Sequence, residues 1–288
     1  MKRVSEKHVN GRKPHTLKKR HTKLNLIIGI VMIGIVIFVA IFAPFLTKYN
    51  YTDADLTNKL APPDADHIFG TDYYGRDVYT KIIFGTRIAL EVAVVSIAIQ
   101  FVIGIIVGLL CGYFGGWVDR ILCFIMDITW AIPPLIMAFA VILIIGKSLI
   151  NAIIAVSIVS WAQYARIVRT KTMSVKNMAF VETGVAFGES VPALMMHYIM
   201  PNIIPSVIVI ASLSIPSAIL STTSLSFLGF GAVNPSPDWG LALSESMKYF
   251  GSAPWTAIFP GLALVFTTFG FTMLGEGLRD ILDPRMKT

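Results

Sequence analysis

The sequence has little charge for its length. Only 14% of its 288 residues are Asp, Glu, Lys or Arg, whereas 55% are hydrophobic, and the mean hydropathy is +0.71. A soluble domain of this size cannot bury so much apolar surface in one core, so the composition excludes a soluble globular protein and predicts a membrane protein. The net charge of +7 is then explained by membrane topology and by attraction to anionic lipid, and we expect no nucleic-acid binding.

The sequence also lacks the motifs of common enzymes. The segment IIGKSL ends like a phosphate-binding loop, but such a loop needs a glycine where this chain has Val141. No HExxH, CxxC or Ser-His-Asp pattern is present, and the only cysteines, Cys111 and Cys123, are expected to be packing residues. We therefore predict a chain that is not an enzyme and that holds no metal or other cofactor of its own.

What the sequence does contain is six apolar stretches, each close to the length that crosses about 30 Å of hydrocarbon as a helix. They predict an all-α polytopic membrane protein with spans at residues 24–46, 88–112, 121–145, 149–165, 203–223 and 256–276. The first stretch offers no small-x-small cleavage site, so we expect a retained span and not a signal peptide. Of the 24 Lys and Arg residues, 17 fall on the side of the N-terminus and 7 on the other, which predicts that both termini are cytoplasmic.

The segments between the spans complete the predicted organisation. It consists of a basic cytoplasmic tail (1–23), a first transmembrane helix (24–46), an outer segment (47–87) and a core of five further spans (88–288), which includes a cytoplasmic loop (166–202) and a second outer loop (224–255). No internal repeat is visible, so any symmetry must come from another chain.

The cytoplasmic loop contains signals for two helices joined by a glycine. Ser174 is expected to cap a helix that runs through Phe187, and Gly188 is placed to end it in the left-handed conformation. Ser190 is expected to cap a second short helix, and Pro201 to block its continuation. Such a pair of helices could pass a movement between a soluble partner and the spans on either side.

Two acidic residues, Glu91 and Asp127, lie within or near the second and third predicted spans. A charge at the bilayer centre costs roughly 2.5 to 3.5 kcal/mol, so each is a possible pore residue that binds a proton or the solute. Both lie near a span end, so structural pairing is the alternative interpretation. Pro133 and Pro134 should break or kink the third span, and Gln163 is interpreted as an interfacial anchor at the end of the fourth.

Five stretches resemble, in order and spacing, the permease subunits of bacterial binding-protein-dependent ABC importers of the oligopeptide, dipeptide and nickel type. They are FGTDYYGRD, MDITWAIPPL, the run from FVETGVAFGES to IMPN, LSFLGFGAVNPSPDWG and GLRDILDPR. The third resembles the cytoplasmic "EAA" loop of that family, with Glu182 in the acidic position and Gly188 as the glycine that follows.

This resemblance implies a type I ABC importer permease fold and a set of partners. These are a homologous permease, two cytoplasmic ATPase subunits that bind ATP and Mg²⁺, and an extracytoplasmic substrate-binding protein. The family's loop forms a coupling helix that docks on an ATPase. Carried over to this chain, the coupling residues are Phe180, Val181, Glu182, Thr183, Gly184, Ala186, Gly188, Glu189 and Ser190. Gly184 replaces an alanine common in the family, which should cost a helix about 1 kcal/mol.

The expected function is that of a transmembrane permease subunit in the bacterial cytoplasmic membrane, importing short peptides by alternating access. The same machinery importing nickel or a metal chelate is an alternative. Two other classes are open at this stage. One is a secondary transporter that uses Glu91 or Asp127 with an ion gradient, and the other is a membrane scaffold or sensor whose cytoplasmic loop only recruits a partner.

Overall fold

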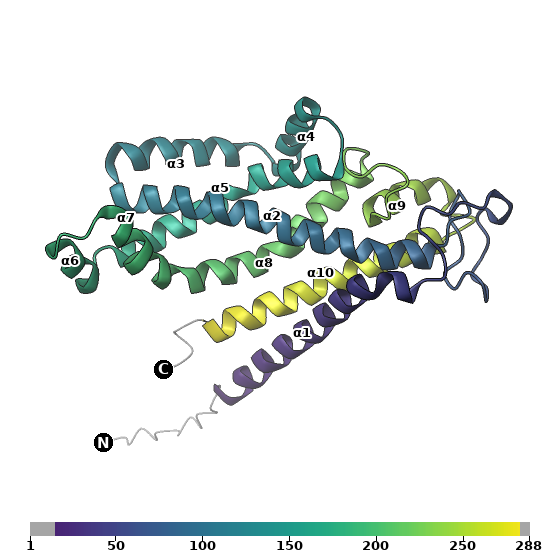
Figure 1. Ribbon diagram of the computed structural model, residues 1–288, viewed down its shortest axis with the longest axis horizontal. Helices are drawn as coiled ribbons and strands as arrows, with labels where there is room; N and C mark the ends of the chain where they lie inside the picture. The colour runs from purple at the N-terminus through teal and green to yellow at the C-terminus, as the bar shows by residue number, and fades with distance from the viewer. Residues whose placement is uncertain (1–14, 283–288) are drawn as a thin grey trace, which may run out of the picture.

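The computed structural model describes residues 15–282 of the chain, and these residues form a nearly all-helical bundle (Figure 1). The longer helices are α1 (His15–Leu46), α2 (Val78–Phe114), α3 (Gly116–Ala131), α4 (Pro134–Ile145), α5 (Leu149–Val175), α8 (Met200–Phe227) and α10 (Trp255–Leu282). The short elements are η1 (Leu56–Asn58), α6 (Ala179–Ala186), α7 (Val191–Ala193), η2 (Leu194–Ile199), α9 (Trp239–Ser246) and η3 (Met247–Tyr249). The predicted all-α fold is confirmed.

Except for α4, which stands across the bundle, the longer helices run roughly along the long axis of the molecule (Figure 1). In Figure 1, α2, α5 and α8 form the centre of the bundle, α3 covers one side, and α1 lies beside α10 on the opposite side. Both ends of the described chain lie at the same end of the bundle as α6 and α7, which we call the α6 end (Figure 1). The segment between α1 and α2 lies with α9 at the other end, which we call the α9 end.

Among the described residues, five helices are long and apolar enough to cross a membrane, and a sixth crossing is possible as a bent pair. That pair is α3 and α4, which meet at an angle of 95° across Ile132 and Pro133. Proline lacks the N–H that would continue the α3 ladder, and its ring clashes with the preceding turn. The predicted break is therefore confirmed, and the predicted span over residues 121–145 consists of two helices.

Most spans are longer than their apolar stretches predicted, and α2 and α5 differ the most. The helix α2 begins at Val78, ten residues before the expected start at 88, because the Asp77 carboxylate caps it by accepting a hydrogen bond from the Thr80 N–H at 2.7 Å. The helix α5 continues to Val175, beyond the expected end at 165. Hydropathy marks where the apolar surface ends, but the backbone helix continues past it, so part of the predicted loop over 166–202 is helical.

Close packing of α2 against α5 depends on a row of glycines. Gly104, Gly108 and Gly112 are spaced four residues apart and therefore share one face of α2. A Cβ added at these positions would lie 2.3 to 2.6 Å from the Cβ atoms of Tyr164, Val168 and Thr172. Small residues at such spacing allow two backbones in a membrane to approach closely. The four-residue spacing of these glycines is visible in the sequence, but the spacing does not show which helix they contact.

Candidate functional site

The predicted coupling segment forms a short helix at the α6 end. The helix α6 starts after Met178, so the prediction that Ser174 caps it is wrong, because Ser174 still belongs to α5. The end of α6 agrees with the sequence prediction. Gly188 has a φ of +77°, which favours glycine, and the Glu189 N–H donates to the Gly184 carbonyl at 3.1 Å in a Schellman-type cap.

The second helix differs from the prediction. Ser190 stands at the N-cap position of α7, but its side chain makes no capping hydrogen bond. Pro201 does not end the helix, because α7 continues through the π-helical turn η2 into α8, with Pro201 in the first turn of α8. The Met200 N–H donates to the Met195 carbonyl, five residues back. The proline's missing N–H thus falls where the backbone changes from π to α hydrogen bonding, so little pairing is lost.

Gly184 is the point where α6 lies against η2. It is buried, and a Cβ there would lie 2.8 Å from Leu194 Cδ2 and 3.3 Å from Tyr198 Cζ. Val181, one turn earlier on the same face, is 1% exposed and belongs to the same apolar cluster as Leu194. The departure from alanine at position 184 is therefore explained by packing, since a larger side chain would hold α6 away from the chain that leads into α8.

The other predicted coupling residues are exposed. They are Phe180, Glu182, Thr183, Ala186, Gly188, Glu189 and Ser190. Two neighbouring apolar side chains that the prediction omitted are also exposed: Phe187 retains 85% of its accessible surface and Val185 57%. Exposed apolar groups gathered on one short helix mark an interaction surface. The signal in the sequence was an aromatic residue beside the helix-ending glycine.

The two possible pore acids have different surroundings. Asp127 forms an ion pair with Arg166 of α5, at an exposed position on α3. Glu91 is exposed on α2 and forms no hydrogen bond or ion pair with any residue in the range 15–282. A second and more enclosed pair joins the same two helices, since Arg169 donates to both Asp119 carboxylate oxygens at 2.5 and 2.6 Å. The acids on α3 thus attach that helix to α5.

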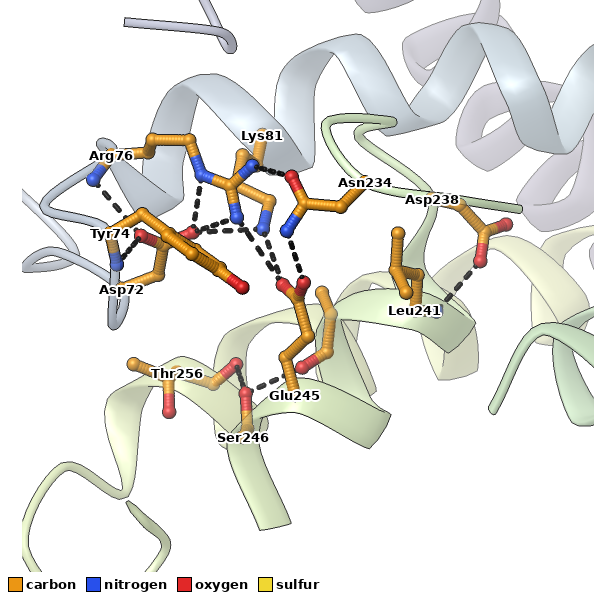
Figure 2. Close-up of polar contacts among 11 residues, drawn as sticks. Asp72, Tyr74, Arg76, Lys81, Asn234, Asp238, Leu241, Glu245, Ser246 and Thr256 are labelled. Carbon is orange, nitrogen blue, oxygen red and sulfur yellow. Dashed lines mark hydrogen bonds and ion pairs between the residues drawn. The ribbon is translucent and has the colours of Figure 1, made fainter. Parts of the chain in front are cut away.

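At the α9 end, a network of buried charges joins two segments that are far apart in the sequence (Figure 2). Arg76 lies at its centre and is 2% exposed. Its guanidinium donates to Asp72 Oδ2 at 2.8 Å, to Asn234 Oδ1 at 2.6 Å and to Glu245 Oε2 at 3.3 Å. Lys81 Nζ donates to the same Asp72 and Glu245 oxygens at 3.0 and 3.4 Å. Two acids and two bases therefore neutralise one another.

This network changes the titration of the carboxyl group at its centre. Burial by itself would raise the pKa of Asp72, but the charges of Lys81 and Arg76 outweigh this effect and hold its pKa below the ordinary value. Asp238, which caps α9 by accepting from the Leu241 N–H at 2.8 Å, lacks such close cations, and burial raises its pKa. Asp72 is therefore held as a carboxylate by its neighbours.

Two tryptophans complete the junction at the α9 end. Trp255 Nε1 donates to the Thr71 carbonyl at 3.2 Å, and Trp239 Nε1 donates to the Ile82 carbonyl at 3.3 Å. The Arg76–Asn234 bond joins the stretches FGTDYYGRD and LSFLGFGAVNPSPDWG directly, so the two are parts of one structure. Sequence analysis identified both stretches, but nothing in their spacing showed that they meet.

This arrangement of helices is found in membrane subunits of solved ABC transporters. One similar structure is that of the MetNI methionine ABC transporter in inward-facing conformations, with a TM-score of 0.54 and 18% identity over 70% of this chain and 95% of that one. Another, an amino acid ABC transporter with histidines, has a TM-score of 0.52 and 17% identity over 68% of this chain and 92% of that one. The predicted ABC importer permease fold is thus confirmed.

The chain belongs to the family of binding-protein-dependent transport system inner membrane components, whose family model matches residues 104–288. A second family model, the N-terminal TM domain of oligopeptide transport permease C, matches residues 26–63. The resemblance stated from the sequence is therefore confirmed. The protein is a multi-pass permease subunit of an ABC importer in the inner membrane, and its family associates with ATPase and substrate-binding partners.

Several named permease proteins are similar to this chain over most of their length. The dipeptide transport system permease protein DppC of Alkalihalophilus pseudofirmus is 41% identical over 91% of this chain and 86% of its own. The oligopeptide transport system permease protein OppC of Bacillus subtilis is 36% identical over 99% of this chain and 93% of its own length. The glutathione transport system permease protein GsiD of Pectobacterium atrosepticum is 38% identical over 88% of this chain and 85% of its own length.

Proposed function

We propose that this chain imports short peptides as one of two homologous permeases in an ABC importer. In this proposal two cytoplasmic ATPase subunits bind and hydrolyse ATP with Mg²⁺, and an extracytoplasmic binding protein delivers the peptide. The relatives described above support peptides over nickel, since they are named for dipeptide, oligopeptide and glutathione transport, and glutathione is itself a short peptide. The chain itself supplies half of the membrane passage and no ATPase site.

The α6 end is proposed to face the cytoplasm. The distribution of Lys and Arg supports this orientation, because their excess falls in segments that would lie at this end. The two ends of the described chain lie there as well (Figure 1). The junction formed by the segments 47–87 and 224–255 would then face outward. Its buried charge network would hold a rigid platform on which the binding protein can dock.

The coupling role of α6 is supported above all by the contact at Gly184. The helix presents Phe187 and Glu182 outward, while its inner face packs on η2, which continues without interruption into α8. A displacement of α6 by an ATPase would therefore be transmitted to a membrane-spanning helix through direct van der Waals contact. Close packing makes such a path stiff, because protein interiors compress little.

The test uses the complete transporter reconstituted in liposomes, with Phe187→Ala and Glu182→Lys as separate variants. We expect each to insert and assemble but to lose ATP hydrolysis stimulated by the peptide-loaded binding protein, and to lose peptide uptake with it. Phe45→Ala is the matched control, since Phe45 of α1 is also 85% exposed but lies outside the α6 surface. Normal coupling in both variants would refute the assignment of α6. Uptake driven by a proton gradient without ATP would instead indicate a secondary transporter.

A further inference from the structure

A polar cavity of about 230 Å³ lies between α2, α5 and α8. Its polar lining consists of Gln100, Ser160, Gln163, Ser214, Ser217 and Ser221. None of the described residues around this cavity is charged. The volume is well above the roughly 10 to 15 Å³ that one water molecule needs, so a cavity with this lining is expected to be hydrated.

Polar side chains at the position of this cavity cost free energy in a membrane. The polar residues come from the middle of three helices that are long and apolar enough to span the bilayer. Gln163, interpreted from the sequence as an interfacial anchor, is not at the end of its helix, because α5 continues to Val175. Polar side chains at such depth are tolerated where they line a water-filled passage or find partners inside the protein.

The side chains around the cavity have few partners of their own. Gln100 is 2% exposed, and its carboxamide forms no hydrogen bond with any residue between 15 and 282. The same holds for the side chains of Gln163, Ser217 and Ser221, whereas Ser214 donates to the Ile210 carbonyl of its own helix at 2.8 Å. A buried amide left without a partner loses the hydrogen bonds it had in water. Gln100 is the buried member of this set, whereas Gln163 and Ser217 are exposed. The free donors and acceptors are therefore available to water or to a solute in this space.

We propose that this cavity, which we call the amide chamber, binds the backbone amide groups of a peptide during its passage. The proposal rests on peptide import as the function. Glutamine carboxamides and serine hydroxyls both donate and accept hydrogen bonds, as a peptide backbone does. Such contacts recognise the backbone of every peptide and are independent of its side chains. The absence of charged lining residues keeps the binding weak, and a site on a transport path must release what it binds.

The chamber can be tested by thiol labelling in the assembled transporter. Ser217→Cys and Ser221→Cys each place a thiol in the chamber with little change in volume. A membrane-impermeant thiol reagent should modify both, and triglycine should slow the modification whereas sorbitol should not. Ser212→Cys on the same helix is the control, because Ser212 does not line the chamber, is 8% exposed and donates to the Val209 carbonyl at 2.8 Å. The unsubstituted complex measures the background from the native cysteines.

A second substitution tests the hydrogen bonding directly. Gln100→Leu, combined with Ser217→Cys, should raise the triglycine concentration needed for half-protection about fivefold, the expected effect of one lost hydrogen bond. Thiols at positions 217 and 221 that react no faster than the buried Ser212→Cys control would overturn the chamber as an aqueous path. Labelling with equal protection by triglycine and sorbitol, or with none, would overturn peptide binding there. Because labelling requires no transport, failure of the unsubstituted complex to take up peptides would count against the proposed function alone.

Discussion

The charge network at the α9 end makes a sharp prediction for Arg76→Met. Methionine preserves most of the aliphatic stem but removes the guanidinium, which now bonds to Asp72, Asn234 and Glu245. The remaining cluster has two carboxylates and only Lys81 as a cation, so it changes from neutral to a net charge of −1. Removing one partner of a buried ion pair costs about 3 to 5 kcal/mol. We expect about 3 kcal/mol, at the lower end of that range, because Glu245 retains 23% side-chain exposure.

The pH dependence separates lost charge from lost packing. In the unsubstituted protein the pKa of Asp72 is lowered, so its carboxylate stabilises the fold above the unfolded pKa of about 3.9, and this stabilisation is lost only as the pH falls through the lower folded value. In Arg76→Met, burial is opposed by one cation instead of two, so the pKa of Asp72 rises. Protonation then relieves the excess negative charge, and the difference in stability from the unsubstituted protein should be smaller at pH 5 than at pH 8.

Thermal unfolding of the purified complex in detergent measures this effect. A thiol-reactive fluorophore can report unfolding, because Cys111 is 1% exposed in the folded chain. Lys48→Met is the matched control, since it breaks the Lys48–Asp66 pair, whose side chains are 69% and 71% exposed. We expect no measurable change there, because exposed ion pairs contribute little. A loss of stability in Arg76→Met that is the same at pH 5 and pH 8, or that equals the control, would refute the reasoning.

Two further predictions concern helix packing at the centre and at the α6 end. Gly108→Leu should prevent α2 from packing on α5 and lower the yield and melting temperature sharply, because even a Cβ would lie 2.5 Å from Val168 Cβ. Gly34→Leu should do neither, since a Cβ there has no neighbour within 4 Å. Arg169→Met should lower the melting temperature more than Arg166→Met, because the Arg169–Asp119 pair is more enclosed. Its side chains are 29% and 19% exposed, whereas those of Arg166 and Asp127 are 44% and 66% exposed. Equal shifts in the last comparison would show that the enclosure of the pair does not matter.

Much of the fold follows from local properties of the chain. The number and order of the apolar stretches predict the membrane-spanning helices, because a helix needs about 20 consecutive apolar residues to cross the hydrocarbon. Each such stretch can be recognised without reference to the rest of the chain. The break at Pro133 and the cap at Gly188 are equally local, since each depends on the covalent geometry of one residue. The helix boundaries were predicted less well. Asp77, whose carboxylate caps α2, and Met178, which precedes α6, both lie outside the apolar stretches.

What the sequence by itself determined is therefore the class of the protein, its helices and the segment proposed to meet an ATPase. Only the tertiary structure decided which distant residues meet. The contact of Gly184 with η2, the pairing of Arg76 with Glu245 and the assembly of the amide chamber all join residues from different helices. Their positions depend on how whole helices pack. Packing is set by the sum of many weak contacts, and no short stretch of sequence specifies that sum.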